Sequence, residues 1–187
     1  DSWMEGVTRS YSHYKSPARE KGTKMLKIGG KLWMYTPRTD RKILIAGHLL
    51  RQSMMGSDLS YEDMMEDHKL SNAYAATLEG YEDFEGTRLA ILHLIAYDKK
   101  TTYQTRKAWV NPENKTVLKE ERFAKSGKIL KRILFKDYEE IAGRIFPRTM
   151  IFKDLLKKNT KTTYKFDVIE FDVEIPGRYF SQSILKR

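Results

Sequence analysis

The sequence predicts a mainly β fold with some helix, built on one large, curved antiparallel sheet. Three observations predict it. Most segments carry the apolar pattern of strands, short turn sequences separate them, and only residues 47–70 change to a helical period. No internal repeat and no low-complexity linker divides the 187 residues, a length that suits one domain. We therefore expect a single half-barrel domain over residues 1–187.

A hairpin is the clearest element of the predicted sheet. Residues 24–28 and 31–35 flank Gly29 and Gly30. Two glycines with access to positive φ are what a two-residue hairpin turn requires. A further strand is expected over residues 42–46, which are apolar and β-branched.

The remaining predicted strands are further apolar stretches between turn residues. They cover residues 1–14, 73–81, 87–97, 102–110, 117–123, 129–135, 144–152 and 163–173. Pro147 indicates a sheet edge or a bulge. The alternation shifts phase near Val168, which predicts a β-bulge that would bend the sheet. Residues 138–142 are expected to be helical or irregular.

One helix is predicted within residues 47–70. Ser60 has the chemistry of an N-cap, and Asp63 follows three residues later, as in a capping box. Tyr61, Met64 and Met65 fall on one face of such a helix. We expect the helix to begin after Ser60.

Charge is distributed unevenly along the chain, which has a formal net charge of +10. Residues 58–86 carry nine acids and one base, whereas residues 98–165 carry nineteen bases and eight acids. A basic half is compatible with nucleic acid, anionic headgroups, an acidic partner or simple solubility. The longest apolar stretch, around residues 89–97, is interrupted and falls short of the ~18 residues that span a bilayer.

Sequence patterns for catalysis or metal binding are missing. The chain has no cysteine, no G-x-S-x-G elbow and no phosphate-binding glycine loop. Its densest acidic cluster comprises Glu62, Asp63, Glu66 and Asp67 with His68, which we interpret as a solvated helix face. We expect no enzyme activity, no metal and no cofactor.

A methionine-rich segment is the most suggestive feature of the composition. Unbranched thioethers adapt to ligands of variable shape, but a methionine stripe is also typical of a core. The segment concentrates half of the eight methionines, at Met54, Met55, Met64 and Met65, beside Leu49, Leu50 and Leu59. Composition alone leaves the function open.

Several motifs carry a family resemblance. They are SPAREKGTKML at residues 16–26, LWMYTP at 32–37, the closing residues 171–187 and, above all, HLLRQSMMGSDLSYED at 48–63. With these motifs the chain resembles the bacterial outer membrane lipoprotein-sorting proteins, the LolA-like group. The resemblance implies an incomplete β-barrel with helices covering its concave face. Such families carry a helix and strands before the matched region, and the chain opens at Asp1 without a Met or a signal segment. We therefore expect the natural N-terminal segment, with any signal peptide or lipidated Cys, to be missing.

The same resemblance implies a function. It is that of a non-enzymatic periplasmic carrier that holds lipid or lipoprotein acyl chains in a hydrophobic cavity on their way to the outer membrane. The implied partners are an inner-membrane transporter or exporter and an outer-membrane acceptor, with peripheral membrane contact. We expect a monomer that does not bind nucleic acid.

The candidate lipid-binding residues are apolar residues of the covering segment and of the first hairpin. They are Trp33, Tyr35, Leu49, Leu50, Met54, Met55, Met64 and Met65. Arg51 is the candidate polar residue that holds the cover shut by donating to backbone carbonyls, and the alternative is an exposed arginine.

Two other functions stay open. One is an envelope protein-interaction or sensing domain on the same fold, which a lack of bound lipid would favour. The other is a basic module that binds nucleic acid or another polyanion through residues 99–165, with Tyr103, Trp109, Phe123 and Phe135 interleaved. Steep salt dependence of binding would identify the second.

Overall fold

The computed structural model describes residues 1–66 and 69–186. The chain divides into two compact units, residues 1–69 together with 173–187 and residues 70–172. Its strands form two antiparallel sheets, so the prediction of one large sheet is wrong. The reason lies in residues 46–66 and 69–73, where short helical turns stand in place of a hairpin that would have paired the strands on either side. The assignment of residues 1–187 to a single domain stays a prediction.

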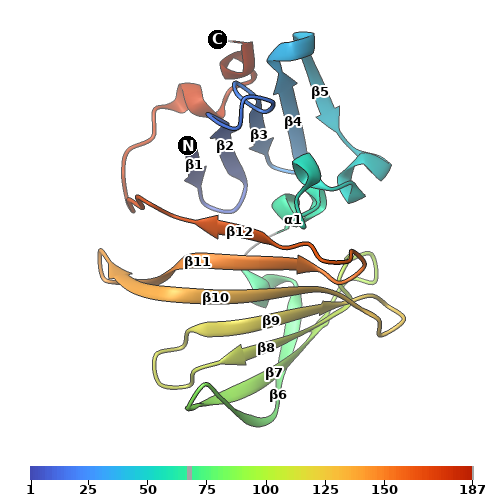
Figure 1. The fold of residues 1–187 in the computed structure, drawn as a ribbon, viewed down its shortest axis with the longest axis vertical. Coiled ribbons are helices and arrows are strands. Elements are labelled where there is room, and N and C mark those ends of the chain that lie inside the picture. The colour runs from blue at the N-terminus through green and yellow to red at the C-terminus, as the bar shows by residue number, and fades with distance from the viewer. Residues whose placement is uncertain (67–68, 187) are drawn as a thin grey trace. The chain divides into compact units, whose positions relative to one another are not determined.

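The first unit contains a five-stranded antiparallel meander (Figure 1). Its strands are β1 (Ser2–Glu5), β2 (Arg9–His13), β3 (Lys24–Ile28), β4 (Lys31–Thr36) and β5 (Arg41–Ile45). The predicted hairpin is confirmed, because Ile28 pairs with Lys31 across the turn and Gly29 has a φ of 55°. Glycine adopts this left-handed conformation without a steric penalty.

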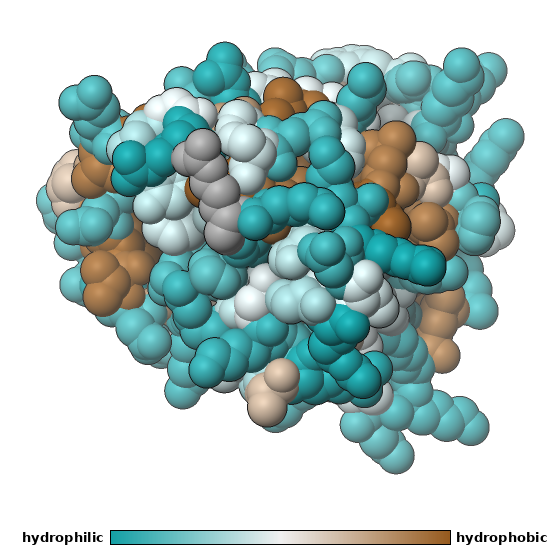
Figure 2. Space-filling model, turned by 90° about the horizontal axis from the view of Figure 1, so that it is seen from above, coloured by the Kyte–Doolittle hydropathy of each residue, from teal (hydrophilic) through white to brown (hydrophobic). Residues whose placement is uncertain are grey.

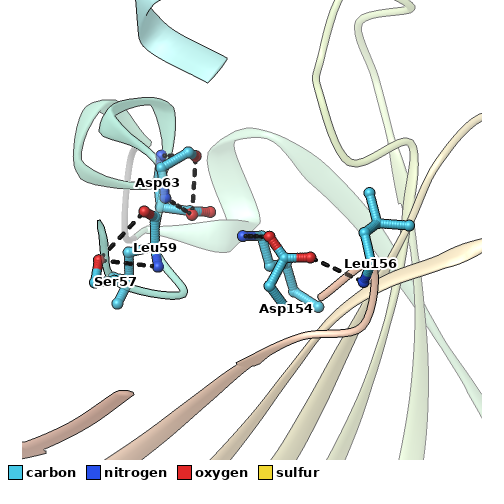
Figure 3. A network of polar contacts seen from close by, with 7 residues as sticks. Ser57, Leu59, Asp63, Asp154 and Leu156 are labelled. Carbon is cyan, nitrogen blue, oxygen red and sulfur yellow. Dashed lines mark hydrogen bonds and ion pairs between the residues drawn. The ribbon is translucent and has the colours of Figure 1, made fainter. Parts of the chain in front are cut away.

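The first unit also contains short helices. They are η1 (Pro37–Thr39), η2 (Gly47–Arg51), η3 (Met54–Gly56), α1 (Tyr61–Met65), η5 (Gly177–Phe180) and η6 (Gln182–Lys186). The predicted cap is confirmed: the Asp63 amide donates to Ser60 Oγ at 3.2 Å, and the Ser60 amide donates to Asp63 Oδ2 at 2.7 Å (Figure 3). The helix that follows has only five residues.

The second unit begins with η4 (Leu70–Asn72) and contains a seven-stranded antiparallel sheet whose strands follow chain order (Figure 1). They are β6 (Tyr74–Phe84), β7 (Thr87–Ala96), β8 (Thr105–Val110), β9 (Val117–Phe123), β10 (Ile129–Ile141), β11 (Arg144–Asp154) and β12 (Thr162–Lys165). Because β6 and β12 are its two edges, the sheet is not a closed barrel.

Two sequence predictions in this unit are wrong. Residues 138–142, expected to be helical or irregular, belong largely to β10, and Ile141 pairs with Arg144 across Ala142 and Gly143. Both turn residues have positive φ, which is uncommon for alanine. The sequence therefore does not indicate a hairpin turn at this position. The strand expected to run to residue 173 ends at Lys165, so the predicted bulge near Val168 does not form.

The surface in view in Figure 2 is mostly hydrophilic and is broken by separate apolar patches. Within residues 1–66 and 69–186, none of the helices has the length and apolar character that crossing a membrane requires.

Candidate functional site

The two faces of the five-stranded sheet carry different side chains. Met25 pairs with Met34 and Leu26 pairs with Trp33, and adjacent residues of a strand point to opposite faces. One face, the methionine face, therefore carries Met25, Lys27, Leu32 and Met34. The other, the aromatic face, carries Lys24, Leu26, Trp33 and Tyr35.

The methionine-rich segment covers the methionine face. The Tyr14 hydroxyl lies 3.7 Å from Met25 Sδ and 3.9 Å from Met54 Sδ. The Tyr61 hydroxyl, on α1, lies 3.5 Å from Met34 Sδ. Met54 is buried, while the other predicted residues of this segment are half-buried: Leu49, Leu50, Met55, Met64 and Met65. These five with Met54 thus lie on one covering segment that packs directly on the sheet.

Trp33 and Tyr35 lie on the aromatic face instead. They pack against a buried cluster of Tyr11, Leu26 and Leu185, the last from η6. The structure therefore does not bring these two aromatic residues together with the methionine-rich segment. Period-two alternation groups Trp33 with Tyr35, but it does not say on which side of the sheet the covering segment lies.

Arg51 does not hold the covering segment in this structure. Its side chain is exposed and makes no hydrogen bond with the described residues. Lys27 makes the kind of contact that was expected of Arg51. Its Nζ donates to the backbone carbonyls of Met65 at 3.3 Å and Glu66 at 3.4 Å. The signal in the sequence was the position of Lys27, two residues after Met25 in the strand pattern and next to Leu26 and Ile28.

The second unit holds an open apolar pocket of about 310 Å³, which sequence reasoning missed. Phe135 of β10 and Met150 of β11 are directly paired in its wall. The main apolar residues that line it are Val117, Phe135, Ile145, Phe146, Pro147 and Met150. They come from β9, β10 and β11. The β11 residues among them follow residues 138–142, which were expected to be helical or irregular.

Tyr138 stabilises one wall of this pocket. Its hydroxyl donates to the Val117 carbonyl, joining β10 to the start of β9. Burial raises the pKa of Tyr138 to about 12. The hydroxyl therefore remains a donor over the physiological range.

Another wall is ionic. Glu120 lines the pocket, and its Oε1 accepts from Arg106 Nη1 at 2.9 Å and from Arg122 Nε at 2.7 Å. Arg106 is 2% exposed and its guanidinium lies 4.7 Å from the ring centroid of Tyr74. Burial would raise the pKa of Glu120, but the charges of Arg122 and Arg106 outweigh it and lower that pKa. The carboxylate is thus kept ionised inside the sheet.

A further ion pair joins β10 to β11. Lys131 Nζ lies 2.9 Å from Asp154 Oδ2, and both side chains are largely buried. The other carboxylate oxygen of Asp154 accepts from the Leu156 amide at 3.0 Å (Figure 3). Lys131 and Asp154 are therefore held by ionic and hydrogen-bonded contacts, as Glu120 is.

The predicted acidic cluster does not form a metal site among the described residues. Within residues 1–66 and 69–186, no three acidic or histidine side chains are placed to hold a metal ion. Asp63 is occupied by the capping box. Asp67 and His68 of the cluster lie outside the described residues.

Comparisons with known proteins agree on the fold. A family model described as "Uncharacterized protein" matches residues 6–187. A DUF1329 family protein from Desulfovibrio piger is 26% identical and superposes with a TM-score of 0.85, covering 95% of this chain and 76% of its own. No curated protein matches the sequence.

Two LolA-like structures share this fold. A domain from Vibrio parahaemolyticus described as an outer membrane lipoprotein-sorting protein is 22% identical, with a TM-score of 0.81, covering 96% of this chain and 77% of its own. A LolA superfamily protein from Nitrosomonas europaea is 23% identical, with a TM-score of 0.79, covering 98% of this chain and 80% of its own. The resemblance that the sequence motifs indicated is therefore confirmed at the level of the fold.

Proposed function

The chain belongs to the family described above as "Uncharacterized protein", and we propose that it is a non-enzymatic carrier of lipid or lipoprotein acyl chains in the periplasm. The fold shared with LolA-like proteins supports the proposal. So does the apolar pocket of the seven-stranded sheet, which is the observation that carries it.

The pocket has the chemistry that an acyl chain requires. Its volume of about 310 Å³ is at the lower end of the range for small-molecule sites, about 300–1,000 Å³. Each buried CH₂ group contributes about 0.8 kcal/mol, so apolar side chains alone can hold a lipid tail. Ile145, 48% exposed, provides apolar surface where a chain can enter.

The methionine-rich segment remains a second candidate surface. Because Met54 is buried against the sheet, a ligand beneath this segment would have to displace that side chain. The pocket of the seven-stranded sheet needs no such movement. We therefore assign the acyl chain to the pocket first, with an inner-membrane donor and an outer-membrane acceptor as the proposed partners.

Native mass spectrometry of the protein incubated with a diacyl lipopeptide or a phospholipid tests the proposal. Met150→Glu places a charge in the pocket, whereas Ile151→Glu, the matched control, places it on the opposite face of the same strand. We expect the wild type and Ile151→Glu to retain the lipid and Met150→Glu to bind it about tenfold more weakly or worse.

Other outcomes would change the assignment. Retention by Met150→Glu and loss in Met55→Glu, Met64→Glu would move the site to the covering segment. A protein that takes up neither probe would contradict the carrier function and favour the protein-interaction or sensing domain.

A further inference from the structure

The loops at one end of the seven-stranded sheet are strongly basic. The sheet is an antiparallel meander, so every second loop lies at the same end. The loops that join β7 to β8, β9 to β10 and β11 to β12 lie together at this end (Figure 1). They comprise residues 97–104, 124–128 and 155–161, which we call the basic end. The basic end holds seven lysines and one aspartate.

The loops at the other end of the same sheet do not share this charge. They comprise residues 85–86, 111–116 and 142–143, and they hold two glutamates and one lysine. Solubility depends on charge over the whole surface, so it does not explain why the bases gather at one end.

Two of the three basic loops are linked directly through β10 and β11. Lys131 pairs with Asp154, and the Leu155 amide donates to the Leu130 carbonyl at 2.8 Å. These contacts hold the start of the β11–β12 loop beside the residues that follow the β9–β10 loop. The lysines of both loops can therefore act on one extended anionic surface.

Most lysines of the basic end face solvent. Six are exposed: Lys99, Lys100, Lys125, Lys128, Lys158 and Lys161. Asp154, the acid that precedes the last loop, lies 2.9 Å from Lys131 Nζ, so its charge is offset within the sheet. A surplus of exposed lysines makes the local potential positive, and this attracts anionic lipid headgroups.

Two large apolar side chains are exposed among these lysines. Tyr97 is 66% exposed and Leu156 is 58% exposed. The backbone holds both in place, because the Tyr97 amide donates to the Ala73 carbonyl at 2.9 Å and the Leu156 amide to Asp154 Oδ1 at 3.0 Å. Tyrosine is enriched at membrane–water interfaces, and leucine beside lysines is typical of segments that lie on a membrane. A nucleic acid would give Leu156 nothing apolar to contact.

We infer that the basic end docks on an anionic phospholipid surface. Its lysines lie on the headgroups, and Leu156 and Tyr97 reach the boundary with the acyl chains. The inference does not rest on the acyl-chain proposal. Residues 145–147, which line the apolar pocket, follow the loop at the other end of the sheet, so docking leaves that pocket accessible to a partner.

Co-sedimentation of the full chain with vesicles of phosphatidylethanolamine and phosphatidylglycerol tests the inference, with phosphatidylcholine vesicles as the neutral reference. The test variant is Lys125→Glu, Lys158→Glu, Lys161→Glu. Each lysine near an anionic surface is worth about fivefold in binding, so we expect a loss of about a hundredfold or more.

The matched control makes the same change in net charge on the same sheet, outside the basic end. It is Lys115→Glu, Lys136→Glu, Lys165→Glu, at three exposed lysines of the second unit. We expect this control to lose far less binding, because these side chains lie away from the docked surface.

A second pair of variants tests the apolar contact. Leu156→Asn should weaken binding to the anionic vesicles about tenfold, as for a leucine that is no longer buried. Leu78→Asn is its control, because Leu78 is 55% exposed but lies within β6. Equal binding by these two variants would contradict the insertion of Leu156.

The remaining outcomes decide the docking itself. If the wild type fails to bind the anionic vesicles, or if the two triple variants lose binding equally, the inference is wrong. If the wild type binds a single-stranded oligonucleotide but not the vesicles, the basic end is a nucleic-acid surface and the inference is also wrong. Circular dichroism checks the fold, and glutamine at the same three positions gives the same comparison should the glutamate variant unfold.

Discussion

Lys27 Nζ lies 3.3 Å from the carbonyl oxygen of Met65, so a lysine of the five-stranded sheet binds the end of the segment that covers it. The last carbonyls of a helix have no partner within the helix, and a basic side chain is a common way to satisfy them. Lys27 is 5% exposed, so the contact is made away from bulk solvent. It fixes α1 on the methionine face.

The first prediction concerns this contact. Lys27→Met keeps the length of the side chain but removes the donor, so we expect the α1 amides to exchange about tenfold faster, as for a lost charged hydrogen bond. Arg51→Ala should leave their exchange unchanged, because Arg51 is exposed. Hydrogen exchange followed by mass spectrometry measures both. Faster exchange in Arg51→Ala alone would restore the cover-closing role of the arginine.

The second prediction concerns the cap of α1. Ser60→Ala removes the acceptor of the Asp63 amide and should lower the free energy of unfolding by about 1 kcal/mol. Ser60→Thr retains a hydroxyl at the same position and should lose much less. Urea unfolding monitored by circular dichroism compares the two variants. Equal losses would show that the capping hydrogen bond is not what stabilises this turn.

Features that depend on neighbouring residues could be predicted from the sequence. The hairpin follows from Gly29 and Gly30 between two alternating runs, and the capping box follows from the spacing of Ser60 and Asp63. In both, the residues that make the structure lie within a few positions of one another. No contact between residues far apart in the sequence has to be known.

The division into two sheets and the faces of those sheets could not be predicted in this way. Whether β5 pairs with β6 depends on how residues 46–73 fold back, and no local pattern states this. Alternation separates Trp33 from Met34, but only the contact of Tyr61 with Met34 shows which face is covered. The candidate cavity residues were therefore assigned to one face although they lie on two.

The apolar pocket was missed for the same reason. Phe135 and Met150 are fifteen positions apart and become neighbours only through the β10–β11 register. The available signal for Lys24 and Lys27 was the presence of lysines in a strand whose other residues are apolar.

The third prediction concerns the ionic wall of the apolar pocket. Glu120→Gln keeps the shape of the side chain but leaves Arg106 and Arg122 without their carboxylate. Breaking a buried ion pair by removing one partner costs about 3–5 kcal/mol. We expect a loss of that order in urea unfolding. Glu139→Gln, which removes the exposed partner of Arg148, is the control and should change the midpoint far less.

The fourth prediction concerns the pH dependence of that same wall. Because the folded-state pKa of Glu120 is lowered, its carboxylate contributes stability above the unfolded-state pKa of about 4.3, and this contribution is lost as the pH falls through the lower folded-state value. The difference in unfolding free energy between wild type and Glu120→Gln should thus be constant near neutral pH and shrink below about pH 4.3. Carboxylates other than Glu120 are present in both proteins, so their contributions cancel in the difference. Urea midpoints measured over this range test it, and a difference that persists unchanged into acid would mean that the variant is destabilised through packing rather than through the charge of Glu120.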